Sequence, residues 1–137
     1  MRPISDARKR TLALQQRALK FSTGVNINCP KRFTTIPPET VWRQLVRAAD
    51  SVSNNLCEAD DASSTADFIH KIRLTLREAK ESRNCLEKLR LARLDHFEAV
   101  LDLEREAGEL CAIFAAVSMK VADRMDREKK AAKQLKN

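Results

Sequence analysis

Residues 41–59 read VWRQLVRAADSVSNNLCEA, and the order of apolar and polar side chains in this stretch decides the fold class. Its apolar side chains recur at spacings of four, three, four and four: Val41, Leu45, Ala48, Val52 and Leu56. At about 100° per residue these five fall within about 80° of arc, which makes them one face of an α-helix. The stretch predicts a helix from about Pro38 to Ala59 that packs this face into a core.

A second stripe on the same predicted helix is polar and lies beside the apolar face. It consists of Gln44, Arg47, Ser51, Asn55 and Glu58. Arg47 and Glu58 stand about 16 Å apart along a helix axis, so each needs a partner from another helix or another subunit. The stripe is compatible with a helix–helix contact, a subunit interface or a ligand site, and a structural contact is favoured. A separate, outermost face is expected near Arg43, Asp50 and Ser53.

The segments on either side carry the same helical period. A first helix is expected to begin after Ser5 or Asp6, which are good N-cap residues, and to end in the polar stretch 26–28. The prolines before the second helix fit its first turn. A third helix is expected to begin after a cap on Ser63 or Ser64.

The third helix is expected to end near Ala92. A fourth is expected to begin at a cap on Asp95 and to lose its apolar period after Met125, so residues 128–137 are expected to form a frayed or disordered basic tail. Strong helix formers dominate the composition and the chain has only 2 glycines, which agrees with helices. Four amphipathic helices with mostly short links predict one all-α domain over residues 1–137, an antiparallel up-down-up-down four-helix bundle.

The formal net charge of +7 is concentrated at the two ends of the chain. In such a bundle the start of the first helix and the end of the fourth lie at the same end of the molecule, so the two basic clusters are expected to be neighbours. Together they are the expected phosphate-contacting surface for RNA or DNA: Arg8, Lys9, Arg10, Lys129, Lys130 and Lys133. The alternative is that this charge only keeps the protein in solution.

The sequence carries no recognisable catalytic, cofactor or metal site. The four cysteines are scattered and two histidines are too few for a di-iron site, so reduced thiols and no bound metal are expected. No stretch of about 18 residues is apolar enough to cross a membrane, and a cytoplasmic location is expected. A metal-independent ribonuclease is a less favoured alternative, because Arg90 and His96 have the spacing that small helical ribonucleases of the HEPN group use.

Residues 44–59, QLVRAADSVSNNLCEA, resemble the signature "QL-RRA--SI--NI-EG" of the 23S-rRNA-intervening-sequence proteins, also called the four helix bundle protein family. Residues 67–82, DFIHKIRLTLREAKES, are similar to that family's "DFL-FL-IA--S" stretch. The positions that match the first signature are Gln44, Leu45, Arg47, Ala48, Ser51, Val52, Asn55, Leu56 and Glu58.

This resemblance implies a four-helix bundle that assembles with copies of itself into a ring, expected to be a homopentamer. It also implies association with nucleic acid, since some relatives are encoded inside ribosomal RNA genes. A related bundle, the accessory protein of diversity-generating retroelements, helps a reverse transcriptase, so a nucleic-acid-processing protein is a further expected partner. The family has no established enzymatic activity. The leading hypothesis is a non-enzymatic oligomeric bundle bound to nucleic acid, and the alternative is a structural or protein-binding oligomer.

Overall fold

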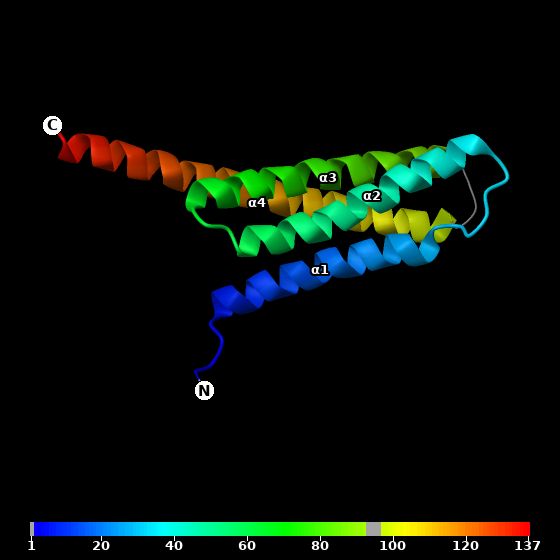
Figure 1. Ribbon diagram of the computed structural model, residues 1–137, viewed down its shortest axis with the longest axis horizontal. Coiled ribbons are helices and arrows are strands. Elements are labelled where there is room, and N and C mark those ends of the chain that lie inside the picture. The colour runs from blue at the N-terminus through cyan, green and yellow to red at the C-terminus, as the bar shows by residue number, and fades with distance from the viewer. Residues whose placement is uncertain (1, 93–96) are drawn as a thin grey trace.

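The fold is a bundle of four antiparallel helices, seen in a computed structural model that describes residues 2–92 and 97–137. The helices are α1 (Asp6–Asn28), α2 (Ile36–Asp60), α3 (Thr65–Leu91) and α4 (Phe97–Leu135) (Figure 1). Each packs on the one before it, and α1 also packs on α4. The predicted all-α, up-and-down four-helix bundle is therefore confirmed.

The helix starts lie where local capping signals place them. Ser5 accepts a hydrogen bond from the backbone N–H of Arg8 at 3.1 Å, and Ser64 accepts one from Asp67 at 3.0 Å. The second helix begins at Ile36, slightly earlier than predicted, because the fixed φ of two following prolines suits a first helical turn. The predicted cap of α4, Asp95, lies outside the described residues.

The core lies between the four helices and contains the predicted apolar face of α2. Leu45, Ala48, Val52 and Leu56 are buried, together with Trp42 from the same helix. The largest buried side chains of the other helices include Phe21, Leu86, Leu89, Leu110 and Phe114. Burial of this apolar area is the main force that holds the helices together.

The prediction of an outermost face on α2 is wrong for two of its three residues. Ser53 is buried and Asp50 is half-buried, because α1 packs against this side of α2. The Asp50 carboxylate accepts hydrogen bonds from the Ser22 hydroxyl and from Asn26 Nδ2, the latter at 2.8 Å. Only Arg43 is exposed as expected.

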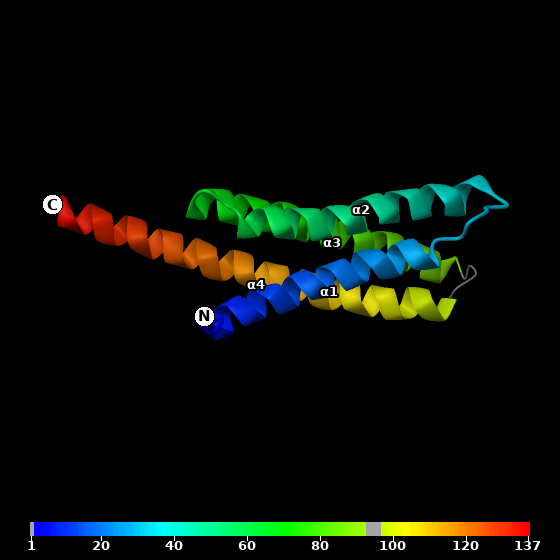
Figure 2. The same cartoon turned by 60° about the horizontal axis from the view of Figure 1, so that its bottom comes forward.

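The two ends of the chain extend beyond the packed part of the bundle. Residues 2–13 are exposed, so α1 joins the core only from its third turn onward. At the other terminus, α4 projects past the ends of α2 and α3 (Figure 2), and every residue from Asp126 on is exposed. The segment 128–135 is helical here, and its expected fraying stays a prediction. Within the described ranges, no helix is long and apolar enough to span a membrane.

Candidate subunit and nucleic-acid interfaces

The charged residues of the α2 polar stripe find their partners on α3 of the same chain. Arg47 lies 2.5 Å from Glu81 and 3.3 Å from Glu78, and Glu58 lies 3.0 Å from Lys71. Because the hydrogen bond from Arg47 favours the ionised form, the pKa of Glu81 is held below its usual range. The stripe's two charges thus act in a helix–helix contact. Its remaining members, Gln44, Ser51 and Asn55, range from exposed to half-buried.

A second pair of glutamates, on α4, is also held by a single arginine. Arg17 on α1 contacts both Glu106 and Glu109 on α4, the second at 2.8 Å. In the part of the chain that the structure describes, no group of three or more histidine, cysteine or acidic side chains could hold a metal ion. Through its contacts with Glu106 and Glu109, Arg17 joins α1 to α4.

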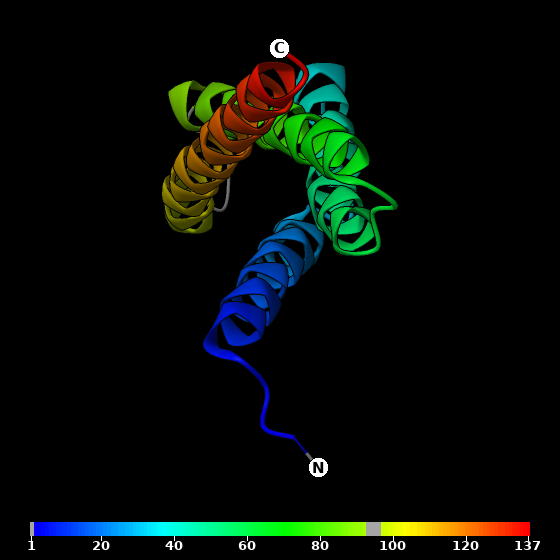
Figure 3. The same cartoon turned by 90° about the vertical axis from the view of Figure 1, so that its left-hand side faces the viewer.

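The structure separates the two basic clusters that were expected to form one surface. The start of α1 and the end of α4 do lie at the same end of the molecule (Figure 1), as antiparallel topology requires. Viewed along the bundle, however, the two segments diverge (Figure 3), because α1 tilts away from the core toward its N-terminus. The two clusters are therefore not the close neighbours that were expected. Their contact with phosphate stays a prediction.

The six residues of that expected surface differ in whether an acidic side chain already pairs with them. Arg8 is engaged by Asp60 at the end of α2, at 2.6 Å, and Lys9 lies 3.8 Å from Asp6. The other four are exposed and form no ion pair with any described residue: Arg10, Lys129, Lys130 and Lys133. Of these six residues, the exposed cations without an ion pair thus lie mainly on the projecting end of α4.

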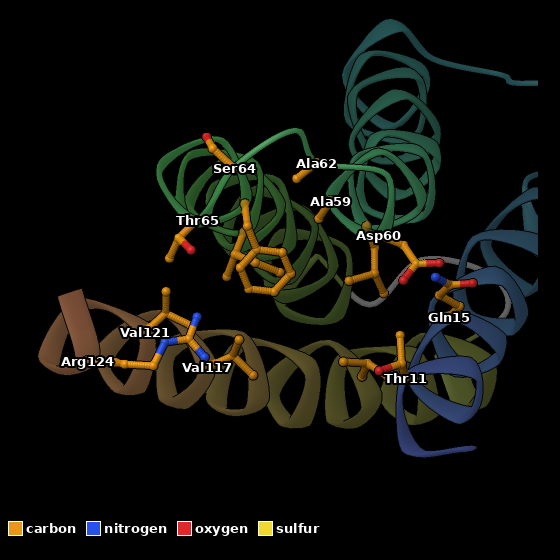
Figure 4. Close-up of a pocket in the computed structure, with 14 residues that line it drawn as sticks. Thr11, Gln15, Ala59, Asp60, Ala62, Ser64, Thr65, Val117, Val121 and Arg124 are labelled. Carbon is orange, nitrogen blue, oxygen red and sulfur yellow. The ribbon is translucent and has the colours of Figure 1, made fainter. Parts of the chain in front are cut away.

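A cavity of about 500 Å³ lies where all four helices meet, at the same end of the bundle. Figure 4 shows Thr11, Gln15 and Asp60 on one side of it and Val121 and Arg124 on the other. Its floor is apolar and includes Leu14, Leu56, Phe68 and Ile72. The hydrogen bond from Arg8 lowers the pKa of Asp60, so this carboxylate at the rim is already paired.

The helix α1 carries a second apolar stripe that the sequence analysis missed. Leu12, Leu19 and Ile27 are 36%, 51% and 75% exposed. At about 100° per residue they lie on the side of α1 opposite its buried residues, Ala18, Phe21 and Val25. The spacing of seven and eight residues between them was the available signal.

This outer stripe borders an open groove of about 810 Å³ between α1 and α4. The two helices approach closely there, since a side chain on Gly24 would meet Leu103 Cδ2 at 3.2 Å. Leu19, Ile27 and Leu103 supply apolar surface, and the Arg17–Glu106 pair lies at its edge. The groove and the stripe form a continuous apolar surface of the kind that an associating protein buries.

Arg90 and the cysteines are the remaining candidate groups that the structure describes. Arg90 lies 2.7 Å from Glu104 on α4, and this hydrogen bond raises its pKa. Its suggested catalytic partner, His96, lies outside the described residues. The four cysteines are free, and burial raises the pKa of Cys85 and Cys111.

Comparison with curated proteins gives no match. Among solved structures, the fold is similar to a crystal structure of a protein of unknown function from the S23 ribosomal protein family of Bacteroides thetaiotaomicron. The TM-score is 0.64 at 24% identity, and the match covers 77% of this chain and 97% of the other. The family model described as 23S rRNA-intervening sequence protein matches residues 10–116, which is more than half of the chain. The chain therefore belongs to the 23S rRNA-intervening sequence protein family.

Proposed function

We propose that this protein is a non-enzymatic, self-associating bundle that contacts the phosphate backbone of RNA or DNA through exposed basic side chains. The observation that carries this proposal is how the charges are distributed. Acidic side chains such as Glu78, Glu81, Glu106 and Glu109 are held between helices by single arginines, whereas many lysines and arginines are left exposed. Cations on a helix surface contact phosphate without reading bases.

Self-association is supported by the outer stripe of α1. Monomeric proteins rarely leave large contiguous apolar patches in water, and Leu19 and Ile27 are mostly exposed beside the α1–α4 groove. A second copy packed on this surface would bury both side chains. In a ring, the stripe of one copy contacts a different surface on the next copy. Such head-to-tail contacts close into a ring when the rotation between copies allows it. The expected homopentamer is one such ring.

The test is a binding titration with the full chain. Fluorescence anisotropy of labelled RNA and DNA would be measured between about 50 and 200 mM salt, over which range a protein that makes several phosphate contacts loses orders of magnitude in affinity. We expect binding that weakens steeply with salt and depends little on sequence. Absence of binding at the lowest salt, or affinity that does not change with salt, would contradict the proposal.

A structural or protein-binding oligomer is the second candidate, and the outer stripe of α1 favours it independently of charge. The same protein would then sediment as an oligomer yet leave nucleic acid unbound. The titration and a sedimentation measurement on one sample therefore separate the two candidates. They also test whether a nucleic-acid-processing protein is needed as a partner, because binding by the isolated chain would show that it is not.

A further inference from the structure

The outward face of α3 carries five cations, which we call the α3 basic stripe: Arg73, Arg77, Lys80, Arg83 and Lys88. All five are exposed, and none forms an ion pair with another residue that the structure describes. The lysine and the arginine of α3 that do pair, Lys71 and Arg90, contact Glu58 on α2 and Glu104 on α4.

The α3 basic stripe is long and nearly straight. At 1.5 Å per residue it extends for about 22 Å along the helix, and at about 100° per residue four of its five members fall within about 80° of arc. Arg83 lies about 60° to one side. It faces α4, since Arg83 and Lys80 both lie close enough to Cys111 to oppose the effect of burial on its pKa.

The borders of the stripe add little negative charge. Toward α2, Glu78 and Glu81 share Arg47, which leaves one net negative charge there. Within the stripe's own sector, Glu87 lies 3.9 Å from Arg90. Toward α4, residues 110–122 contain no aspartate or glutamate. The seven lysines and arginines of α3 thus outnumber its four carboxylates, and its outward face carries a net positive charge.

Such a row is unfavourable for the helix on its own, because like charges three and four residues apart repel each other. An anionic partner laid along the row would remove that repulsion and release its own counterions. The tail of α4 carries more cations per turn, but every residue from Asp126 on is exposed and packs on no other described helix. The start of α1 has lost Arg8 to Asp60. Of the basic surfaces described, the α3 basic stripe is the one on a packed stretch of helix, in contact with two neighbours, α2 and α4.

We propose that the α3 basic stripe is the phosphate-contacting surface of this protein and that its partner is a nucleic-acid duplex. This inference rests on the proposed function and names the surface and the substrate class. Proteins that hold single strands stack bases on aromatic side chains. Of the aromatic residues whose side chains the structure describes, none is exposed, and Trp42 and Phe114 are buried in the core. A duplex needs no stacking surface, and about 22 Å of its axis presents about a dozen phosphate charges.

Two variants that remove the same charge test the assignment. The stripe variant combines Arg73→Gln, Arg77→Gln and Lys80→Gln, and the tail variant combines Lys129→Gln, Lys130→Gln and Lys133→Gln. The probes are an RNA duplex, a DNA duplex of the same sequence and single-stranded polyuridine. For the stripe variant we expect the slope of log affinity against log salt to fall by about 2.7 and duplex binding at about 0.15 M salt to weaken about a hundredfold. The tail variant should lose less than tenfold.

The possible results separate this inference from the proposed function. If the parent binds and the tail variant loses as much affinity as the stripe variant, or more, the α3 basic stripe is not the binding surface, although the protein still binds nucleic acid. If polyuridine binds more tightly than both duplexes, the duplex assignment is wrong. If the parent binds none of the probes, the proposed function itself fails.

Folding is controlled in two ways. Gln is a good helix former and all three positions are exposed, so helicity and melting temperature should match the parent. A charge-preserving variant, Arg73→Lys with Arg77→Lys, should bind duplex as the parent does. If the triple variant loses helicity, Arg83→Gln with Lys88→Gln takes its place, with an expected fall in slope of about 1.8.

Discussion

The guanidinium of Arg47 on α2 lies 2.5 Å from Oε1 of Glu81 on α3, and the same side chain reaches Glu78 at 3.3 Å. One cation thus binds two carboxylates that face it across the α2–α3 contact. Since Arg47 is 53% exposed, water screens the attraction and its contribution to stability is modest. Its second consequence is electrostatic, because its positive charge offsets one of the two negative charges beside the α3 basic stripe.

We expect Arg47→Gln to lower the free energy of unfolding by up to about 1 kcal/mol, because two glutamates on one helix are left without their partner. Urea unfolding followed by circular dichroism measures this. Arg43→Gln is the matched control, since Arg43 lies one turn earlier on α2 and pairs only within its own helix, with Glu39 at 2.8 Å. That variant should cost about 0.3 kcal/mol. Equal losses would argue against a role for the interhelical contact.

Stability is expected to fall in acid, because arginine hydrogen bonds lower the pKa of Asp60 and of Glu81. Each carboxyl then takes up its proton at a higher pH in the unfolded chain than in the fold, so the unfolded state binds more protons and stability rises with pH across that window. This contribution to stability is complete above the ordinary pKa values, 3.8 for Asp60 and 4.5 for Glu81. It is lost as the pH falls through the lower pKa values that these carboxyls have in the folded protein.

Melting temperatures measured between about pH 5 and pH 2 test this pH dependence. The parent should lose stability steadily over the range, and Arg47→Gln should lose less, because Glu81 then titrates nearer its ordinary value. A melting temperature that is constant over the range, or a variant as sensitive to acid as the parent, would rule out these pairs as the cause.

The outer stripe of α1 is expected to hold the assembly together. Leu19→Glu with Ile27→Glu should convert the oligomer to a monomer, because two charges would have to be desolvated at the interface. Both residues are more than half exposed in the single chain, so helicity should be unchanged. Analytical ultracentrifugation at micromolar concentration provides the measurement.

The control for this variant is Met119→Glu, which places a charge at an apolar residue of α4 that is 69% exposed. It should leave the oligomer intact. A parent that sediments as a monomer, or a double variant that still assembles, would show that the α1 stripe is not a subunit interface.

The cysteines are expected to differ sharply in reactivity. Cys57 is exposed and should react quickly with an aromatic disulfide reagent, whereas Cys85 and Cys111 are buried and burial raises their pKa. Cys111→Ala should cost about 1 kcal/mol, and Cys57→Ala almost nothing. Fast labelling of all four thiols in the folded protein, or unfolding on addition of a reductant, would contradict this picture.

The helix limits could be read from the sequence because the signals that set them are local. Ser5 and Ser64 cap the helices that follow them by accepting a hydrogen bond from the backbone N–H three residues further along, and prolines mark the start of α2. The apolar period of α2 also identified which side enters the core. These features depend on neighbours in the chain and need no knowledge of tertiary packing.

The contacts between helices could not be read in the same way. A helix in a bundle touches two neighbours, so the residues that flank its apolar face can be covered as well, and Ser53 and Asp50 are covered by α1. The sequence also did not reveal that Arg8 pairs with Asp60, 52 residues away. Basic residues were sought as runs along the chain, which finds Lys129 and Lys130 but overlooks a row spaced at helical intervals on α3.

The projecting end of α4 has a consequence for how the protein responds to solution conditions. Residues 126–135 form about three exposed turns, and a helix without packing partners is only marginally stable in water. Lys129 and Lys133 are four residues apart and repel each other. Added salt screens both this repulsion and the attraction between Arg124 and Glu128, which lie 3.9 Å apart, so its two effects on the helix oppose each other. A change of solution conditions that alters the helical length of this segment leaves the core intact, because none of its side chains belongs to that core.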